Sequence, residues 1–255
     1  MATEEIEQAV LTEARGRVLL ITLNRPEAMN SINGALSAGL VAAIEKLDSD
    51  PDFTVGILTG AGRGFSAGMD LKAFARGEDL GPMMDFIRNG SKKPLIGAIE
   101  GFALAGGLEL ALTCDLLVAS EGVKLGIPEV GVGLFAAAGG LLRLPTRVGH
   151  GRAMEMALTA EPIRAEEAFS LGMVARLSPQ GEAVRIAMEL AGRIAQNAPL
   201  AVAASKQLIN LSHGLTDDEF YEAQKEHSRI VFSSKDAQEG PRAFAEKRPP
   251  EWSGQ

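Results

Sequence analysis

The chain has 255 residues, of which 46% are hydrophobic and 23% are charged, proportions that are ordinary for a soluble globular protein. Its net charge of −8 argues against binding to nucleic acid or to an anionic membrane, and its single cysteine, Cys114, excludes an intramolecular disulfide and a four-cysteine zinc site. No apolar run is long enough to span a membrane, and the acidic N-terminal segment MATEEIEQAV lacks the basic and apolar regions of a secretory signal, so we expect a cytoplasmic protein.

Short apolar runs that end at turn residues predict buried strands in the first half of the chain. These runs are Val18–Leu23, Val55–Thr59, Leu95–Ile99, Leu116–Ser120 and the shorter Val123–Leu125. Apolar residues at helical spacing predict one helix that begins at Asn33 and ends before Pro51, and another over Leu80–Asn89. Strands that alternate with helices in this way indicate an α/β fold.

The second half of the chain is predicted to be mainly helical, with one strand at Val174–Leu177. Helices are expected at Met154–Thr159, Ala165–Leu171, Glu182–Asn197, Pro199–Leu211, Thr216–Val231 and Ala237–Glu246. The last residues, KRPPEWSGQ, are expected to be disordered. We therefore expect a region of mixed strands and helices over residues 1–198 and a helical region over residues 199–255.

The stretch Glu100–Phe135 carries the strongest chemical signal in the chain. A glycine pair, Gly106 and Gly107, stands before an apolar helical run, with Glu109 just inside that run and Glu129 in a later Ile-Pro-Glu corner. Glycine lets a ligand approach the backbone, and the free N–H groups at a helix start favour an anion or a developing oxyanion. Apolar neighbours are expected to raise the pKa of the Glu109 carboxyl toward a range useful for proton transfer. The stretch predicts acid–base chemistry at a carbonyl compound.

The glycine-rich loop Gly60–Asp70 allows three interpretations. Its glycines follow a predicted strand, as in a dinucleotide-binding fingerprint, but their spacing is wrong and no helix opens directly after them. The motif Gly-Phe-Ser66-Ala-Gly matches a nucleophile elbow, which would make the protein a serine hydrolase, yet six residues separate Ser66 from the strand end at Thr59. The third interpretation, which we favour, is that the loop supplies a second backbone N–H donor.

Three motifs, FSAGMDLK, GFALAGGLELALTCD and LGIPEVGVG, together resemble the crotonase (enoyl-CoA hydratase/isomerase) superfamily, and most closely its enoyl-CoA hydratases. The resemblance covers nearly the whole chain, from LITLNRPEAMNSIN to AFAEKRPPEW. It implies an α/β fold built as a crotonase-like spiral of ββα units, followed by a helical C-terminal trimerisation region. It also implies a homotrimer or a dimer of trimers.

The resemblance implies roles for individual residues. In such enzymes the oxyanion hole would be the backbone N–H groups of Met69 and Gly106, and the catalytic carboxylates would be Glu109 and Glu129. The residues implied to bind CoA are Arg25, Ala67, Lys72 and Lys247, the last of them across a subunit boundary. No metal and no cofactor is implied beyond the coenzyme A of the substrate.

The implied activity is the reversible addition of water to a 2-enoyl-CoA thioester in fatty acid or related acyl-CoA metabolism. A Δ3,Δ2-enoyl-CoA isomerase and a carnitinyl-CoA dehydratase-like enzyme are the related alternatives. A non-catalytic or RNA-binding member would need a lost glutamate or a basic surface, and the sequence has neither.

The chain departs from the commonest hydratase pattern at three places. Ala105 stands where a glycine is usual, Leu108 where a smaller residue often stands, and Phe135-Ala136-Ala137 replaces a proline-containing loop. The third departure lies near the expected acyl pocket and leaves the identity of the acyl group open.

Overall fold

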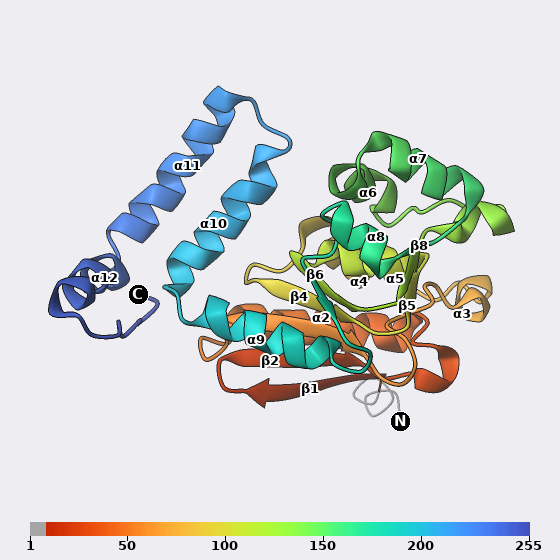
Figure 1. Cartoon of the computed structure of the whole chain (residues 1–255), viewed down its shortest axis with the longest axis horizontal. Coiled ribbons are helices and arrows are strands. Elements are labelled where there is room, and N and C mark those ends of the chain that lie inside the picture. The colour runs from red at the N-terminus through yellow and green to blue at the C-terminus, as the bar shows by residue number, and fades with distance from the viewer. Residues whose placement is uncertain (1–8) are drawn as a thin grey trace.

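A six-stranded sheet forms the main layer of the fold, in the order β1-β2-β3-β4-β6-β9 (Figure 1). The structure, a computed structural model, describes residues 9–255 apart from the side chain of Pro82. The strands are β1 (Val10–Arg15), β2 (Val18–Leu23), β3 (Val55–Gly60), β4 (Leu95–Ile99), β6 (Leu116–Ser120) and β9 (Arg176–Ser178). Only β1 and β2 pair antiparallel in this sheet, and the other neighbours are parallel. Most of the N-terminal segment that argues against a secretory signal lies outside the described residues.

Both faces of the sheet are covered at its inner strands β2, β3, β4 and β6, which explains why these four strands are continuous apolar runs. Along β2, Val18 and Leu20 pack in one cluster with three alanines of α9 (Ala183–Ala195). Leu19 and Ile21 point to the opposite face, into the main core with α2 (Gly34–Ser49). The alanines, Ala183, Ala187 and Ala191, recur every four residues and let α9 approach the sheet closely.

A region of shorter elements packs into the main core on one side of this sheet. A second sheet has the order β5-β7-β8, with β5 (Phe102–Leu104), β7 (Lys124–Gly126) and β8 (Ile163–Arg164). The helices of this region are η1 (Pro26–Ala28), α3 (Leu71–Ala75), α4 (Gly81–Asn89), α5 (Gly106–Thr113), η2 (Pro128–Val132), α6 (Gly140–Val148), α7 (His150–Thr159) and α8 (Ala165–Ser170).

The last three helices extend away from the sheets, on the side of the molecule opposite α3 (Figure 1). They are α10 (Pro199–Ser212), α11 (Asp217–Phe232) and α12 (Lys235–Glu246). A domain boundary at residue 199 stays a prediction. Of the helices that the structure describes, none is both long and apolar enough to cross a membrane.

The C-terminal tail differs from its prediction, because it is held in place rather than disordered. The indole Nε1 of Trp252 donates to the Gln196 carbonyl at 2.7 Å. The Asp236 carboxylate, which is buried, accepts from the backbone N–H groups of Ser253 at 2.7 Å and Gly254 at 3.0 Å. Composition alone suggested disorder because the partners of these groups lie directly after α9 and on α12, many residues earlier in the chain.

Candidate active site

A cavity of about 540 Å³ brings together five of the site residues that the sequence singled out. The loop after β3 contributes Ala67 and Met69, and α5 contributes Gly106 and Glu109. Glu129, in η2, lines the same cavity. The remaining wall is apolar and includes Leu80, Met83, Met84 and Ile87 around α4, and Val132, Leu134 and Phe135 after β7.

Two backbone N–H groups, those of Met69 and Gly106, lie next to each other in this wall. A Cβ placed on Gly106 would stand 3.5 Å from the Met69 nitrogen, and one on Gly68 would stand 2.9 Å from the Gly106 nitrogen. Neither N–H group has a hydrogen-bond acceptor among the described residues. Two adjacent free donors at the start of α5 form a place for a carbonyl oxygen that gains negative charge.

The turn before Gly106 is strained. Ala105 has φ 51° and ψ −132°, a backbone conformation that side chains rarely adopt and that favours glycine. Holding such a residue there costs on the order of 1–3 kcal/mol. The turn persists because Ala105 donates its N–H to the Gly126 carbonyl at 2.9 Å and accepts from Leu108 at 2.9 Å. The alanine at this position therefore carries a conformational cost directly beside the free Gly106 N–H.

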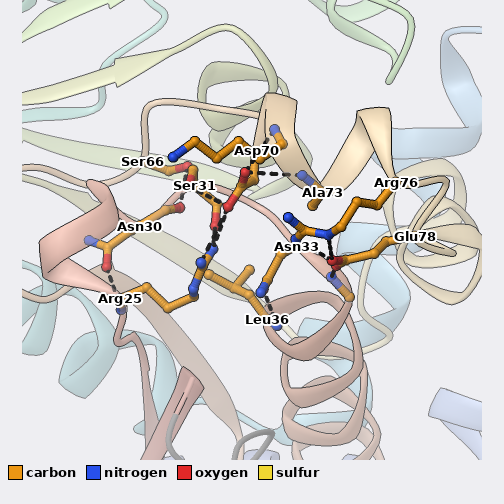
Figure 2. Close-up of polar contacts among 12 residues, drawn as sticks. Arg25, Asn30, Ser31, Asn33, Leu36, Ser66, Asp70, Ala73, Arg76 and Glu78 are labelled. Atoms are coloured by element: carbon orange, nitrogen blue, oxygen red, sulfur yellow. Dashed lines mark hydrogen bonds and ion pairs between the residues drawn. The ribbon is translucent and has the colours of Figure 1, made fainter.

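Ser66 fixes the shape of the first loop. Its side chain is fully buried, donates to the Asn30 carbonyl at 2.8 Å and accepts from the Gly68 N–H at 3.1 Å (Figure 2). Ser66 has no histidine partner in the described part of the chain. A hydroxyl so engaged is a structural anchor, so the geometry does not support a serine hydrolase.

Glu109 is buried, with 3% of its surface exposed, and its carboxylate is held from one side. Oε1 accepts from the backbone N–H groups of Ala138 at 2.7 Å and Gly140 at 2.8 Å. Burial raises the pKa of Glu109, and these two hydrogen bonds and the charge of Arg143 offset part of the rise. The Gly140 backbone can approach Glu109 this closely because glycine has no side chain. A Cβ at this position would lie only 3.0 Å from Oε1.

Glu129 presents a carboxylate oxygen without a partner. Its Oε2 atom is buried and has no hydrogen bond to any described residue. Burial raises the pKa of Glu129, and the nearby charge of Glu109 adds to the rise. Buried polar atoms are nearly always paired, so an unpaired one that lines a cavity is available to a ligand.

The residues expected to bind CoA do not all reach the cavity. Ala67 lines it, and Lys72 is exposed on α3 beside Leu71, another lining residue. Lys247 ends α12, which Figure 1 places at the far side of the molecule from α3, so Lys247 does not reach the cavity of its own chain. Arg25 is turned toward Asp70 and the Ser31 carbonyl instead.

Sequence reasoning missed the groups that hold Glu109. No helix was predicted directly after Gly139, whereas α6 begins at Gly140, whose N–H donates to Glu109. A glycine pair before an apolar helical run was the available signal, because the same pattern identified Gly106 and Gly107 at the start of α5.

A model of the Enoyl-CoA hydratase/isomerase family matches residues 13–255. The chain belongs to this family. It is 40% identical to the enoyl-CoA hydratase EchA19 of Mycobacterium tuberculosis, over 98% of each chain. It is also 40% identical to the carnitinyl-CoA dehydratase of Proteus mirabilis, over 98% of this chain and all of that protein. A crystal structure of an enoyl-CoA hydratase from Mycobacterium tuberculosis superposes with a TM-score of 0.94 at 50% identity, over 98% and 100% of the chains.

Membership of the enoyl-CoA hydratase/isomerase family confirms the expected fold class, a mixed α/β crotonase-like fold with a helical C-terminal region. Because the relatives align over nearly the whole of their length, the resemblance is not confined to the cavity.

Proposed function

We propose that the protein is an enoyl-CoA hydratase, which adds water reversibly to a 2-enoyl-CoA thioester. The observation that carries this proposal is one cavity with two free backbone donors and two carboxylates of raised pKa. The family and its hydratase relatives support the same activity.

In this reaction the thioester oxygen accepts from the N–H groups of Met69 and Gly106, which withdraws electrons from the double bond. The Glu109 carboxylate takes a proton from water while the water oxygen bonds to the β-carbon. The π electrons move onto the thioester oxygen as an enolate, which the two donors stabilise. Glu129, as the protonated acid, then delivers a proton to the α-carbon, and transfer of the proton from Glu109 to Glu129 restores the pair. We propose that no metal or redox cofactor takes part, the coenzyme A being part of the substrate.

The cavity favours an acyl group without charge. Among the described residues that line it, Glu109 and Glu129 are the ionisable ones, and the rest of the wall is aliphatic, methionine or Phe135. No cation there could pair with a carboxylate at the end of an acyl chain, and no aromatic cage surrounds a quaternary ammonium group. The carnitinyl-CoA alternative is therefore less favoured. The isomerase alternative needs one carboxylate to carry a proton between carbons, whereas the cavity presents two.

A panel of three acyl-CoA substrates tests this proposal. An unbranched, uncharged 2-enoyl-CoA is expected to be hydrated with the highest kcat/KM. Analogues with a γ-trimethylammonium or a terminal carboxylate group are expected to fall by about 10-fold or more, because the wall cannot compensate for desolvation of their charge. Equal rates with a charged analogue would contradict the assignment of the acyl group. Migration of a 3-enoyl double bond without net hydration would contradict the hydratase itself.

We also propose that the protein assembles as a homotrimer or a dimer of trimers. In the single chain, α10 and α11 contain no buried residue, yet they expose large apolar side chains such as Ile209 (63%) and Phe232 (78%). Exposed apolar surface of this kind indicates an interface. A neighbouring subunit would also be needed to bring Lys247 near a CoA site. Light scattering at micromolar concentration is expected to give a multiple of three chains, and a monomer would contradict it. The cytoplasmic location stays a prediction.

A further inference from the structure

We propose that Arg25 and Asp70 form an ion pair that positions the Met69 oxyanion donor, and that Arg25 acts through Met69 rather than by touching CoA. This inference rests on the proposed function, because it concerns the stabilisation of a thioester enolate. Both side chains are largely withdrawn from solvent, with 19% of Arg25 and 16% of Asp70 exposed. Their closest approach joins Arg25 Nη2 to Asp70 Oδ2 at 3.3 Å (Figure 2).

Met69 lies between two backbone hydrogen bonds to the same residue, Ile32. The Ile32 N–H donates to the Gly68 carbonyl at 2.8 Å, and the Asp70 N–H donates to the Ile32 carbonyl at 2.9 Å. These two bonds set the direction of the Met69 N–H, which lies between them. This N–H has no acceptor among the described residues. The direction of this donor therefore depends on how firmly the segment around Ile32 is tied to the segment around Asp70.

The Asp70 carboxylate ties these segments from both sides. Its Oδ1 accepts from the N–H groups of Lys72 at 3.1 Å and Ala73 at 3.2 Å, which fixes the start of α3. Its Oδ2 faces Arg25 and lies 3.5 Å from the Ser31 hydroxyl. Burial alone would raise the pKa of Asp70, but the Ala73 and Lys72 N–H groups and the Arg25 guanidinium hold it below its usual range. Asp70 is thus an ionised anchor directly after the donor residue.

Arg25 completes the connection on the other side. Its Nη1 donates to the Ser31 carbonyl, and its backbone N–H donates to the Asn30 side chain at 2.8 Å (Figure 2). The guanidinium is therefore engaged with one carbonyl and one carboxylate, a use for which its planar fork is suited. Neither Arg25 nor Lys72 lines the cavity, but Lys72, on α3, is exposed and could approach a phosphate.

The test compares Arg25→Gln, Asp70→Asn and Arg25→Lys with the control Arg76→Gln. The control removes the cation of the neighbouring Arg76–Glu78 pair (Figure 2), whose arginine is 62% exposed. Three measurements are needed: kcat for hydration of an uncharged 2-enoyl-CoA, the ultraviolet absorbance of the enolate of a bound 3-ketoacyl-CoA, and the dissociation constant of free CoA. The second reports the oxyanion donors without turnover.

Arg25→Gln and Asp70→Asn are expected to lower kcat by about 10- to 100-fold and to lower the bound enolate fraction, since a small misplacement of a reacting group has such effects. The dissociation constant of free CoA is expected to change less than about 2-fold, because no phosphate contact is lost. Arg25→Lys keeps the charge but loses the planar fork of donors, so its enolate fraction is expected to lie between those of Arg25→Gln and the wild type. The control is expected to match the wild type in every measurement.

Weaker CoA binding by Arg25→Gln, with an unchanged enolate fraction, would show that Arg25 contacts CoA and would overturn the inference. If Arg25→Gln or Asp70→Asn does not fold, the comparison of Arg25→Lys with the wild type decides, and an unchanged enolate fraction there overturns the inference too. A wild type that binds the ketoacyl ligand as enolate but hydrates no 2-enoyl-CoA would contradict the proposed function alone.

Discussion

Glu109→Gln and Glu129→Gln are each expected to lower kcat for hydration of a 2-enoyl-CoA by about 10²–10⁴-fold, the usual contribution of a general acid or base. Both carboxylates line the cavity, and glutamine keeps the size and the acceptor oxygen while removing the proton transfer. Because the pair acts as a unit, the double variant is expected to be little worse than either single one. Steady-state kinetics of the three variants measure this.

The pH profile identifies which carboxylate is the base. Burial raises the pKa of both groups above the ordinary value of 4.5. The wild-type kcat/KM is expected to fall at low pH as Glu109 becomes protonated, and to fall at high pH as Glu129 loses its proton. Glu109→Gln is expected to abolish the acid limb and Glu129→Gln the alkaline limb in the residual activity. If Glu109→Gln hydrates a 2-enoyl-CoA as fast as the wild type, Glu109 is not the water-activating base. If only Glu129→Gln loses activity, the enzyme is an isomerase.

Thermal unfolding of the same variants provides the control for folding. A carboxyl group whose pKa is raised by folding binds its proton more tightly in the folded state, so its ionisation lowers stability as the pH rises through the folded pKa. This cost is absent below the unfolded pKa and present at neutral pH. Since glutamine never ionises, Glu109→Gln and Glu129→Gln are expected to be at least as stable as the wild type at pH 7.

Gly107→Ala is expected to lower kcat by about 10²–10³-fold, as the loss of one oxyanion donor does. A Cβ at this position would lie 2.3 Å from the Ser66 carbonyl oxygen and 2.8 Å from its carbonyl carbon. Both are backbone atoms, so the first loop or the start of α5 must move. Because Met69 lies on the loop and Gly106 on the helix, either movement separates the two donors. Single-turnover kinetics measure the chemical step directly.

Gly151→Ala is the matched control for this substitution. Gly151 lies in α7, and a Cβ there would meet no atom within 4 Å. Its activity is expected to be unchanged and its stability to rise by about 0.5–1 kcal/mol, because alanine favours helix over glycine. An active Gly107→Ala enzyme would show that the contact between Ser66 and Gly107 does not set the distance between the donors.

The parts of the fold that were predictable are those whose signal is local. Val18–Leu23, Leu95–Ile99 and Leu116–Ser120 were predicted with the bounds that β2, β4 and β6 have, because burial on both faces leaves a continuous apolar run. The strand predicted at Val174–Leu177 starts two residues too early, because β9 begins at Arg176. This strand pairs with β6 through only three residues, so its local signal is short. Strand β1, whose pattern is one buried residue and five exposed ones, has no apolar run to detect.

Within the candidate site, the residues that were predictable are those whose own type is chemically unusual, such as Glu109 among leucines. Their supporting contacts were not predictable, because they join distant segments through backbone groups. The Ala138 and Gly140 N–H groups that hold Glu109 come from 29 and 31 residues further along the chain. No property of Ala138 in the sequence indicates that its amide donates to the Glu109 carboxylate. The contact between Arg25 and Asp70, 45 residues apart, was hidden for the same reason.

Ala105 affects when the turn before Gly106 loses its conformational entropy, during folding or during binding. Glycine in this turn would have a wide choice of conformations, and binding would have to restrict them before the Gly106 N–H could meet its acceptor. The methyl group of Ala105, held at φ 51°, removes most of that choice during folding. Most of this freedom is then lost before any thioester arrives, and the proposed donor of Gly106 is expected to lose little more when the substrate binds.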